Sequence, residues 1–313
     1  MHDDPRIHVS LSHLRSLEGA ARGLSFLPQQ PSASSLNGRH ASRLRGRGLN
    51  FEELRTYLPG DDIRSIDWKA SARTGETYVR VFTEERDRPA LLVIDQRMSM
   101  FFGSVLNLKS VTAAEAAAIA AFRILGAGDR VGGIVFDDDR QLEFVPKRGR
   151  RTIFALLEAV ATMNCALKAD SKQRSVAGSL NNELESVVRL AHHDHLVIVF
   201  SDFDGIDGTT HRWLTSIAAH NDLILAMVYD PAARRLGQER PAIVGDGARQ
   251  AEIDFSAPAV LQAVADASSG RLDRIIEWQN SINLSVLPLS SGEATLQQIQ
   301  QLLGASAPRQ RVR

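Results

Sequence analysis

Two acidic residues directly follow apolar runs that are typical of buried strands. Asp95 comes after the run from Ala90 to Ile94, and Asp202 comes after the run from 195 to 201. Parallel strands end at the same edge of a sheet, and open α/β sheets bind their ligands at that edge. We therefore expect the two carboxylates to lie close together at a binding edge.

Hydroxyl side chains are expected at the same edge. Ser99 lies in the loop after Asp95, and Thr152 lies at the start of a predicted helix. Carboxylates and hydroxyls are hard oxygen ligands that suit Mg²⁺ or Ca²⁺. Arg97 lies between Asp95 and Ser99, and its guanidinium carries a positive charge and has no lone pair to offer a metal. The pattern therefore leaves two alternatives, a cation site and a site in which Arg97 pairs with Asp95 or Asp202 in place of the cation.

The elements that must position these residues alternate along the second part of the chain. Such alternation is typical of a doubly wound α/β sheet. Strands are predicted at 90–95, 130–136, 141–145, 195–201, 222–229 and 282–288, with a hairpin within 242–255. Helices are predicted at 109–125, 151–164, 179–193, 210–220, 257–281 and 293–303.

This arrangement resembles the von Willebrand factor A fold and its metal-ion-dependent adhesion site over residues 90–303. That site has the pattern Asp-x-Ser-x-Ser, then a Thr, then an Asp after a central strand. The resemblance implies that Mg²⁺ would be bound by Asp95, Ser99, Thr152 and Asp202. Arg97 departs from the pattern, because it occupies the position of the first Ser. The binding residues implied are these four together with Arg97.

A stretch in the N-terminal part of the chain points to a more specific family. Residues 48–73, GLNFEELRTYLPGDDIRSIDWKASAR, are similar to the signature of the domain of unknown function 58 family. Members of that family carry the signature ahead of a von Willebrand A-like domain and typically accompany MoxR-type AAA+ ATPases. The resemblance implies a non-enzymatic adaptor that works with such an ATPase in assembling or activating a complex that contains a client protein.

The sequence divides into two domains at about residue 88. Residues 1–88 are expected to form an N-terminal helix within 10–27, a basic loop and a small, partly β subdomain, and residues 89–313 the von Willebrand A-like domain. A strand is predicted at 77–82, paired with an extended piece before Ala90. The basic loop contains four arginines that could contact nucleic acid, Arg39, Arg43, Arg45 and Arg47.

An enzymatic alternative rests on three residues of the signature. Asp61, Asp67 and Lys69 echo metal-dependent nucleases and phosphoesterases, in which carboxylates bind Mg²⁺ and a lysine assists the attacking water. The flanking residues favour a turn and a short helix over core strands. We therefore favour an ion-pair network that fixes the small subdomain to the sheet. Its predicted members are Arg55, Asp61, Asp62, Arg64, Asp67, Lys69 and Arg73.

The amino-acid composition restricts the classes of protein to which this chain could belong. Basic and acidic residues number 37 each, so no global charge favours nucleic acid or an acidic membrane. The one cysteine, Cys165, lies in an apolar helical pattern and is expected to be buried, which suits a reducing compartment. No apolar run approaches the roughly 20 residues needed to span a bilayer. These features predict a cytoplasmic protein without membrane insertion.

Two polar clusters have simple structural interpretations. His192, His193 and His195 lie at the end of a predicted helix, where histidine complements the helix dipole. Asp137 to Asp139 separate two predicted strands and suit a solvated turn.

Overall fold

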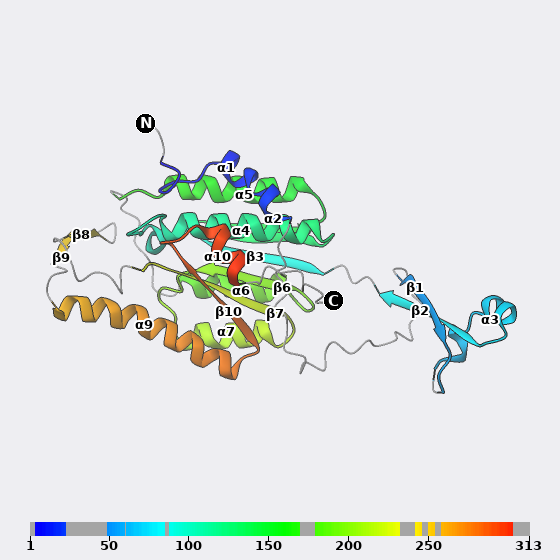
Figure 1. Cartoon of the computed structure of the whole chain (residues 1–313). Helices are drawn as coiled ribbons and strands as arrows, with labels where there is room; N and C mark the ends of the chain where they lie inside the picture. The colour runs from blue at the N-terminus through cyan, green and yellow to red at the C-terminus, as the bar shows by residue number, and fades with distance from the viewer. Residues whose placement is uncertain are drawn as a thin grey trace, which may run out of the picture. The chain divides into compact units, whose positions relative to one another are not determined.

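The computed structural model describes residues 4–22, 49–59, 61–84, 88–169, 179–231, 242–245, 250–253 and 258–302 (Figure 1). The chain forms two compact units. The large unit comprises Met1–Pro28 and Arg88–Arg313, and the small unit comprises Gln29–Asp87.

The large unit is built on a six-stranded sheet with the strand order β10-β7-β6-β3-β4-β5. All neighbouring strands are parallel except β4 and β5, which are antiparallel. The strands are β3 (Pro89–Asp95), β4 (Arg130–Phe136), β5 (Gln141–Lys147), β6 (Leu196–Ser201), β7 (Asp222–Tyr229) and β10 (Leu284–Ser290). This mostly parallel sheet with helices on both faces confirms the predicted α/β class.

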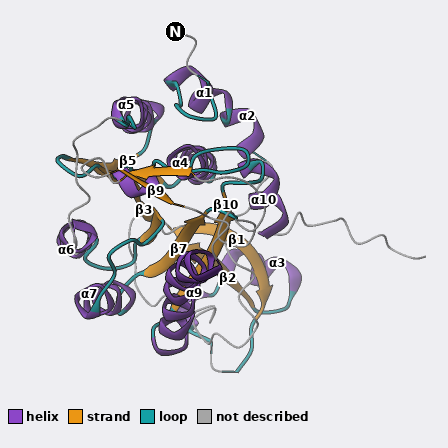
Figure 2. Ribbon diagram, turned by 90° about the vertical axis from the view of Figure 1, so that its left-hand side faces the viewer, coloured by secondary structure: helices purple, strands orange, loops and turns teal. Residues whose placement is uncertain are grey.

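Helices cover both faces of this sheet (Figure 2). Alternate residues of β3 point to opposite faces, so that Leu92 and Ile94 join one hydrophobic cluster and Leu91 and Val93 join the other. The first face packs against α1 (Leu11–Ser16), α2 (Glu18–Ala21), α4 (Lys109–Gly126), α5 (Arg150–Ala166) and α10 (Thr295–Leu302). The second face packs against α6 (Ser179–Leu190), α7 (Gly208–Ala218) and α9 (Pro258–Ser281).

The N-terminal segment is part of the large unit. Val9 and Leu14 are buried in the cluster that contains α4 and α5. The amide of Val9 donates to Asn164 Oδ1 at 2.8 Å, and Asn164 donates to Gln96 Oε1 at 2.9 Å. The observed division therefore differs from the sequence-based one, which grouped residues 1–88, because these contacts attach the first helices to α4 and α5.

The small unit contains β1 (Leu49–Thr56), the 3₁₀ helix η2 (Ile63–Ser65), α3 (Trp68–Thr74) and β2 (Tyr78–Glu84). β2 pairs antiparallel with β1, which precedes it in the chain, and not with a piece before Ala90 as expected. Asp67 caps α3 by accepting from the amides of Lys69 and Ala70, and Gly75, with a φ of +81°, ends that helix.

Element boundaries within the large unit agree with the sequence analysis to within about three residues. The strands β8 (Ala242–Gly245) and β9 (Gln250–Ile253) pair antiparallel, as the predicted hairpin requires. Cys165 is exposed, so the prediction that it is buried was wrong. Within the described ranges, no helix has the length and apolar character needed to cross a bilayer. The basic loop that contains Arg39, Arg43, Arg45 and Arg47 lies outside the described residues.

Candidate functional site

The site is built around the carboxyl end of β3. Asp95 is the last residue of this strand and is fully buried. β3 pairs in parallel with β6 so that Ile94 lies beside Phe200, and the two strands therefore end together. Ser201 donates from its hydroxyl to Asp95 Oδ2 at 2.6 Å, and Asp202 follows at the same edge. The parallel register thus explains why two carboxylates 107 positions apart share one site.

Arg97 lies within the carboxylate cluster. Its side chain is only 1% exposed, and its Nε and Nη2 atoms donate to both oxygens of Asp95 over 2.7–3.1 Å. Its Nη1 donates to Ser179 Oγ at 3.0 Å, and its Nη2 lies 3.9 Å from Asp202 Oδ1. Burial alone would lower the pKa of Arg97, but Asp95 and two further carboxylates outweigh burial and raise it. The guanidinium is therefore a permanent charge in this site.

Asp202 is bound by a second set of cations and donors. Lys109 Nζ lies 2.6 Å from its Oδ2, and the Ser99 hydroxyl donates to its Oδ1 at 3.3 Å. Arg271 donates to its backbone carbonyl at 3.1 Å and to the Asp204 carboxylate at 2.5 Å. Burial would raise the pKa of Asp202, but Lys109 and Arg97 outweigh it and lower the pKa. The carboxylates and cations of this site thus form one network in which each charge has a partner of opposite sign. Its members are Asp95, Asp202, Asp204, Arg97, Lys109 and Arg271.

The structure brings together four of the five residues proposed from sequence: Asp95, Arg97, Ser99 and Asp202. Thr152 is not among them. β5 runs antiparallel to β4, so its last residue, Lys147, pairs with Val131 at the opposite end of the sheet. Thr152 follows that end in the first turn of α5, whereas Asn164, near the end of the same helix, reaches the carboxyl edge. The reversed edge strand therefore separates Thr152 from the site.

The sequence analysis did not identify Lys109, Ser179, Asp204 or Arg271 as residues of this site. Lys109 and Ser179 each open a helix, and Lys109 does so directly after the loop that follows Asp95. This position at a helix start is a signal that could have placed Lys109 at the edge. Arg271 comes from α9, and no local pattern points to its partner Asp204, 67 residues earlier.

Comparison with known proteins identifies the family. The profile of the family described as "Protein of unknown function DUF58" matches residues 53–268. The chain belongs to this family. It is also similar to uncharacterized proteins of Mycobacterium bovis and of two strains of Mycobacterium tuberculosis. Each is 28% identical over 254 residues, which cover 81% of this chain and 75% of the relative.

The donor set of this DUF58 protein does not fit a bound Mg²⁺. Mg²⁺ requires oxygen ligands at about 2.0–2.1 Å. Both oxygens of Asp95 already accept from Arg97, and the Ser99 hydroxyl is directed at Asp202. Among the described residues, no group of three or more His, Cys, Asp or Glu side chains could hold a metal ion. The geometry supports the alternative in which Arg97 takes the cation's place.

Two further acids of the DUF58 site have unpaired oxygens. Asp138 accepts from the amide of Met98 at 2.6 Å through Oδ2, while its Oδ1 is buried without a hydrogen-bond partner. Burial raises its pKa to about 6 despite that hydrogen bond. Burial and the nearby charge of Asp95 raise the pKa of Glu183 to about 7, and its Oε2 is likewise unpartnered. Asp138 is thus integrated into the site, and the prediction of a solvated turn was wrong for this residue.

The acids of the enzymatic alternative have structural partners. Asp61 accepts two hydrogen bonds from Arg55 at 2.7 and 2.8 Å, and this interaction lowers its pKa. Asp67 caps α3 and accepts from Arg80 at 2.9 Å, which lowers its pKa as well. Lys69 is exposed. The predicted pair of Arg55 with Asp61 is thus confirmed, whereas Asp67 pairs with Arg80, which the prediction did not include. Both acids are bound by arginines, and this geometry does not favour a hydrolytic centre.

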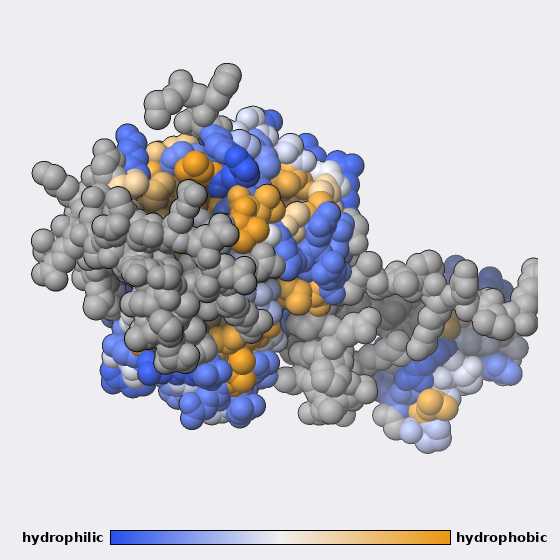
Figure 3. Space-filling view, turned by 60° about the vertical axis from the view of Figure 1, so that its left-hand side comes forward, coloured by the Kyte–Doolittle hydropathy of each residue, from blue (hydrophilic) through white to orange (hydrophobic). Residues whose placement is uncertain are grey.

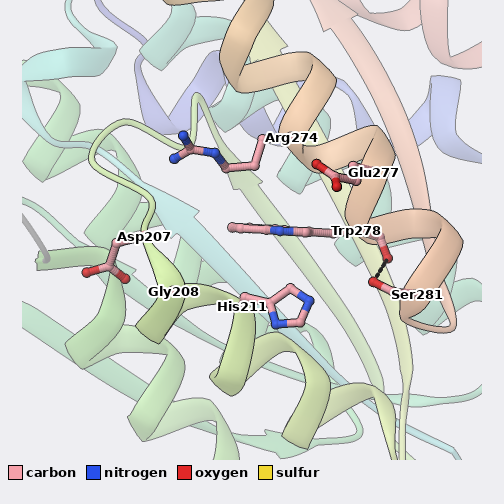
Figure 4. Close-up of a pocket in the computed structure, with 7 residues that line it drawn as sticks. All are labelled: Asp207, Gly208, His211, Arg274, Glu277, Trp278 and Ser281. Carbon is pink, nitrogen blue, oxygen red and sulfur yellow. Dashed lines mark hydrogen bonds between the residues drawn. The ribbon is translucent and has the colours of Figure 1, made fainter.

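A hollow lies between α7 and α9 in the described part of the DUF58 chain (Figure 4). Its volume is about 470 Å³, and Trp278 meets His211 edge to face within it, at 5.2 Å between ring centroids. The hollow lies apart from Asp95 and Asp202, neither of which lines it. Its lining residues are Asp207, Gly208, His211, Arg274, Glu277, Trp278 and Ser281. His193 and His195, for which a helix-end role was predicted, follow the end of α6 at Leu190. His193 Nδ1 lies 3.3 Å from Asp194 Oδ2, and His195 Nδ1 lies 2.8 Å from the backbone carbonyl oxygen of His193.

Proposed function

We propose that this protein is a non-enzymatic binding module whose carboxyl sheet edge docks a partner protein. The observation that carries the proposal is the closed network around Arg97. Asp95 and Asp202, the groups best placed to bind a metal or act as a base, are both bound by cations of the chain itself. A network with satisfied charges fixes the shape of an edge and does not prepare it for chemistry.

The outward surface of this edge supports the proposal. The loop that follows Asp95 contains the 3₁₀ helix η3 (Met98–Met100) and then exposes the large apolar side chains of Phe102, Val105 and Leu106. Ser104 donates to Asp230 from its amide and its hydroxyl, at 2.9 and 2.5 Å. The loop is therefore fixed at its centre while its apolar side chains face outward, as a preorganised contact surface requires.

The fold and the family supply the proposed partner. The strand order and the position of the polar cluster support assignment to the von Willebrand A-like group, with Arg97 in place of the ion of the adhesion site. The signature at 48–73 supports a role alongside a MoxR-type AAA+ ATPase, in assembling or activating a complex that contains a client protein. We place this adaptor role in the cytoplasm, in keeping with the single cysteine and the composition.

Binding of the full chain to the purified MoxR-type ATPase of the same genome tests the proposal. We expect Val105→Ser combined with Leu106→Ser to weaken binding at least about tenfold, because both remove exposed apolar contact area. Val145→Ser is the matched control, since Val145 is exposed on the edge strand β5, away from the loop. A chelator should leave the affinity unchanged. Absence of binding between the folded proteins would reject the ATPase as partner.

A further inference from the structure

Few of the described side chains of the small unit are buried hydrophobic ones. Among its residues with described side chains, only Ala70 and Val79 are buried hydrophobic residues. The regular elements that the structure describes in it are a two-stranded sheet, a seven-residue helix and a 3₁₀ turn. A two-stranded hairpin is at best marginally stable in water unless another surface covers it. A surface packed against the described part of the unit would therefore stabilise it.

Large apolar side chains lie on the outside of this unit. Trp68 is 66% exposed, Ile63 is 63% exposed and Leu58 is 60% exposed. Single exposed hydrophobic residues are ordinary, but tryptophan is rarely so exposed, and these three lie within eleven positions of one another. Figure 3 shows hydrophobic surface beside hydrophilic surface on the described part of this unit. We use the name signature face for these three exposed side chains, all of which belong to the 48–73 signature.

Some of the charged residues near the signature face form ion pairs within the unit, and others are exposed. The acids Asp61 and Asp67 are paired with Arg55 and Arg80 inside the unit, while Asp62 is exposed and accepts from the amide of Arg64. The remaining cations are exposed and form no ion pair with any residue that the structure describes: Arg64, Lys69 and Arg73. On α3, Lys69 and Arg73 are four positions apart and lie in a row next to Trp68 and Ala72. The face thus has a basic margin along α3.

We propose that the signature face is a docking surface for an acidic protein surface, with Trp68 as its anchor. Tryptophan and arginine are the residues that most often dominate binding energy at interfaces, and acids on the partner would pair with Lys69 and Arg73. A protein fits better than a nucleic acid, because residues 54–80 contain five basic and four acidic residues and the aliphatic Leu58 and Ile63 flank the indole. The proposal goes beyond the sheet edge, and its first test rests on the ATPase proposed above.

The first test measures the affinity of the full chain for the MoxR-type ATPase in 0.1 M and 0.5 M NaCl. We expect Trp68→Ala to weaken binding at least about tenfold and Trp68→Phe to retain most of the affinity. Lys69→Glu with Arg73→Glu should weaken binding in 0.1 M NaCl and less in 0.5 M NaCl, because salt screens exposed charges. Trp213→Phe, in the large unit, is the matched aromatic control. Wild-type affinity in both the Trp68→Ala and the double charge variant would overturn the signature face and leave the adaptor role intact.

A second test decides the case in which the wild-type chain does not bind the ATPase. Benzoylphenylalanine in place of Trp68 is introduced into the full chain in the source organism, and crosslinked products are identified by mass spectrometry. A crosslink to an acidic segment of another protein, lost on Lys69→Glu with Arg73→Glu, supports the signature face although the ATPase is rejected. Crosslinks only to nucleic acid, to a second copy or within the chain itself, or no crosslink at all, overturn it.

Discussion

The carboxyl sheet edge and the signature face differ in whether their cationic side chains are paired with carboxylates. At the sheet edge, Arg97, Lys109 and Arg271 are each paired with a carboxylate, and the guanidinium of Arg97 is enclosed by the protein. On the signature face, Asp61 and Asp67 are paired inside the unit, while three cations and three large apolar side chains are exposed. The first region therefore holds its partners within its own network, and the second presents exposed groups that a partner could contact.

This difference corresponds to two roles of charged residues, one in the stability of the fold and one in the recognition of a partner. Buried charges that are fully paired contribute shape and specificity, but removing one partner is costly because the other charge is left unpaired in a low-dielectric site. Exposed charges contribute little to folding and are available for recognition. Substitutions at the sheet edge should therefore act on stability, and substitutions on the signature face should act on binding.

The largest effect is expected at Arg97. Arg97→Ala leaves Asp95 buried without its cation and should lower the free energy of unfolding by about 3–5 kcal/mol, measured by urea denaturation. The control is Arg189→Ala, which removes a surface ion pair with Glu143 and should cost no more than about 1 kcal/mol. Equal effects of the two changes would show that the edge network is no more important than a surface pair.

A second substitution at the same position asks whether the guanidinium replaces a cation. Arg97→Ser gives Asp95 and Ser99 the spacing Asp-x-Ser-x-Ser. We expect Mg²⁺ to bind this variant and to raise its melting temperature by several degrees, with no effect on the wild-type chain. Calorimetric titration with MgCl₂ measures the binding. An unchanged trace for a folded variant would contradict the replacement.

A smaller effect is expected at Glu183, whose folded-state pKa of about 7 lies above the ordinary 4.5. The folded state therefore favours the protonated acid, and the stability from this group is full below pH 4.5 and is lost as the pH rises through 7. Glu183→Gln, which mimics the protonated acid, should be more stable than wild type by about 1–2 kcal/mol at pH 8 and nearly equal at pH 4.5.

Urea denaturation at the two pH values checks this prediction. Glu185→Gln is the control, because Glu185 is exposed on the same helix. A stability difference that does not depend on pH would show that Glu183 does not titrate as its burial requires.

The smallest effect is expected in the small unit. Asp67→Ala removes the cap of α3 and the pair with Arg80, and should speed amide hydrogen exchange in α3 about fivefold while β3 and β6 exchange as before. Glu76→Ala, an exposed change in the turn after α3, is the control. Faster exchange in the central strands as well would indicate that the two units unfold together.

The sequence predicted the sheet and half of its site for clear physical reasons. Continuous apolar runs locate β3, β6 and β7, and the ends of parallel strands bring Asp95 and Asp202 together. Thr152 was placed wrongly because the direction of the edge strand β5 depends on its pairing with β4, which local patterns do not show.

The remaining site residues depend on contacts that span long stretches of sequence. The pairing of Arg271 with Asp204 is made between α9 and the loop after β6, and Asp138 is drawn into the site by the amide of Met98. The pairing of β1 with β2 and the docking of the first helices are also long-range choices. Composition and periodicity indicate which side of a helix or strand is apolar. They do not show which helices and strands pack against one another, and these contacts depend on that packing.

The hydrogen bond between Val9 and Asn164 has a consequence for synthesis of the chain. The two residues are 155 positions apart, and ribosomes add about 5–20 residues per second. Val9 is therefore added to the chain roughly 8–30 s before Asn164. During that interval Leu14 and its neighbours have no α5 to cover them. The first part of the large unit to be made is thus among the last to reach its final position.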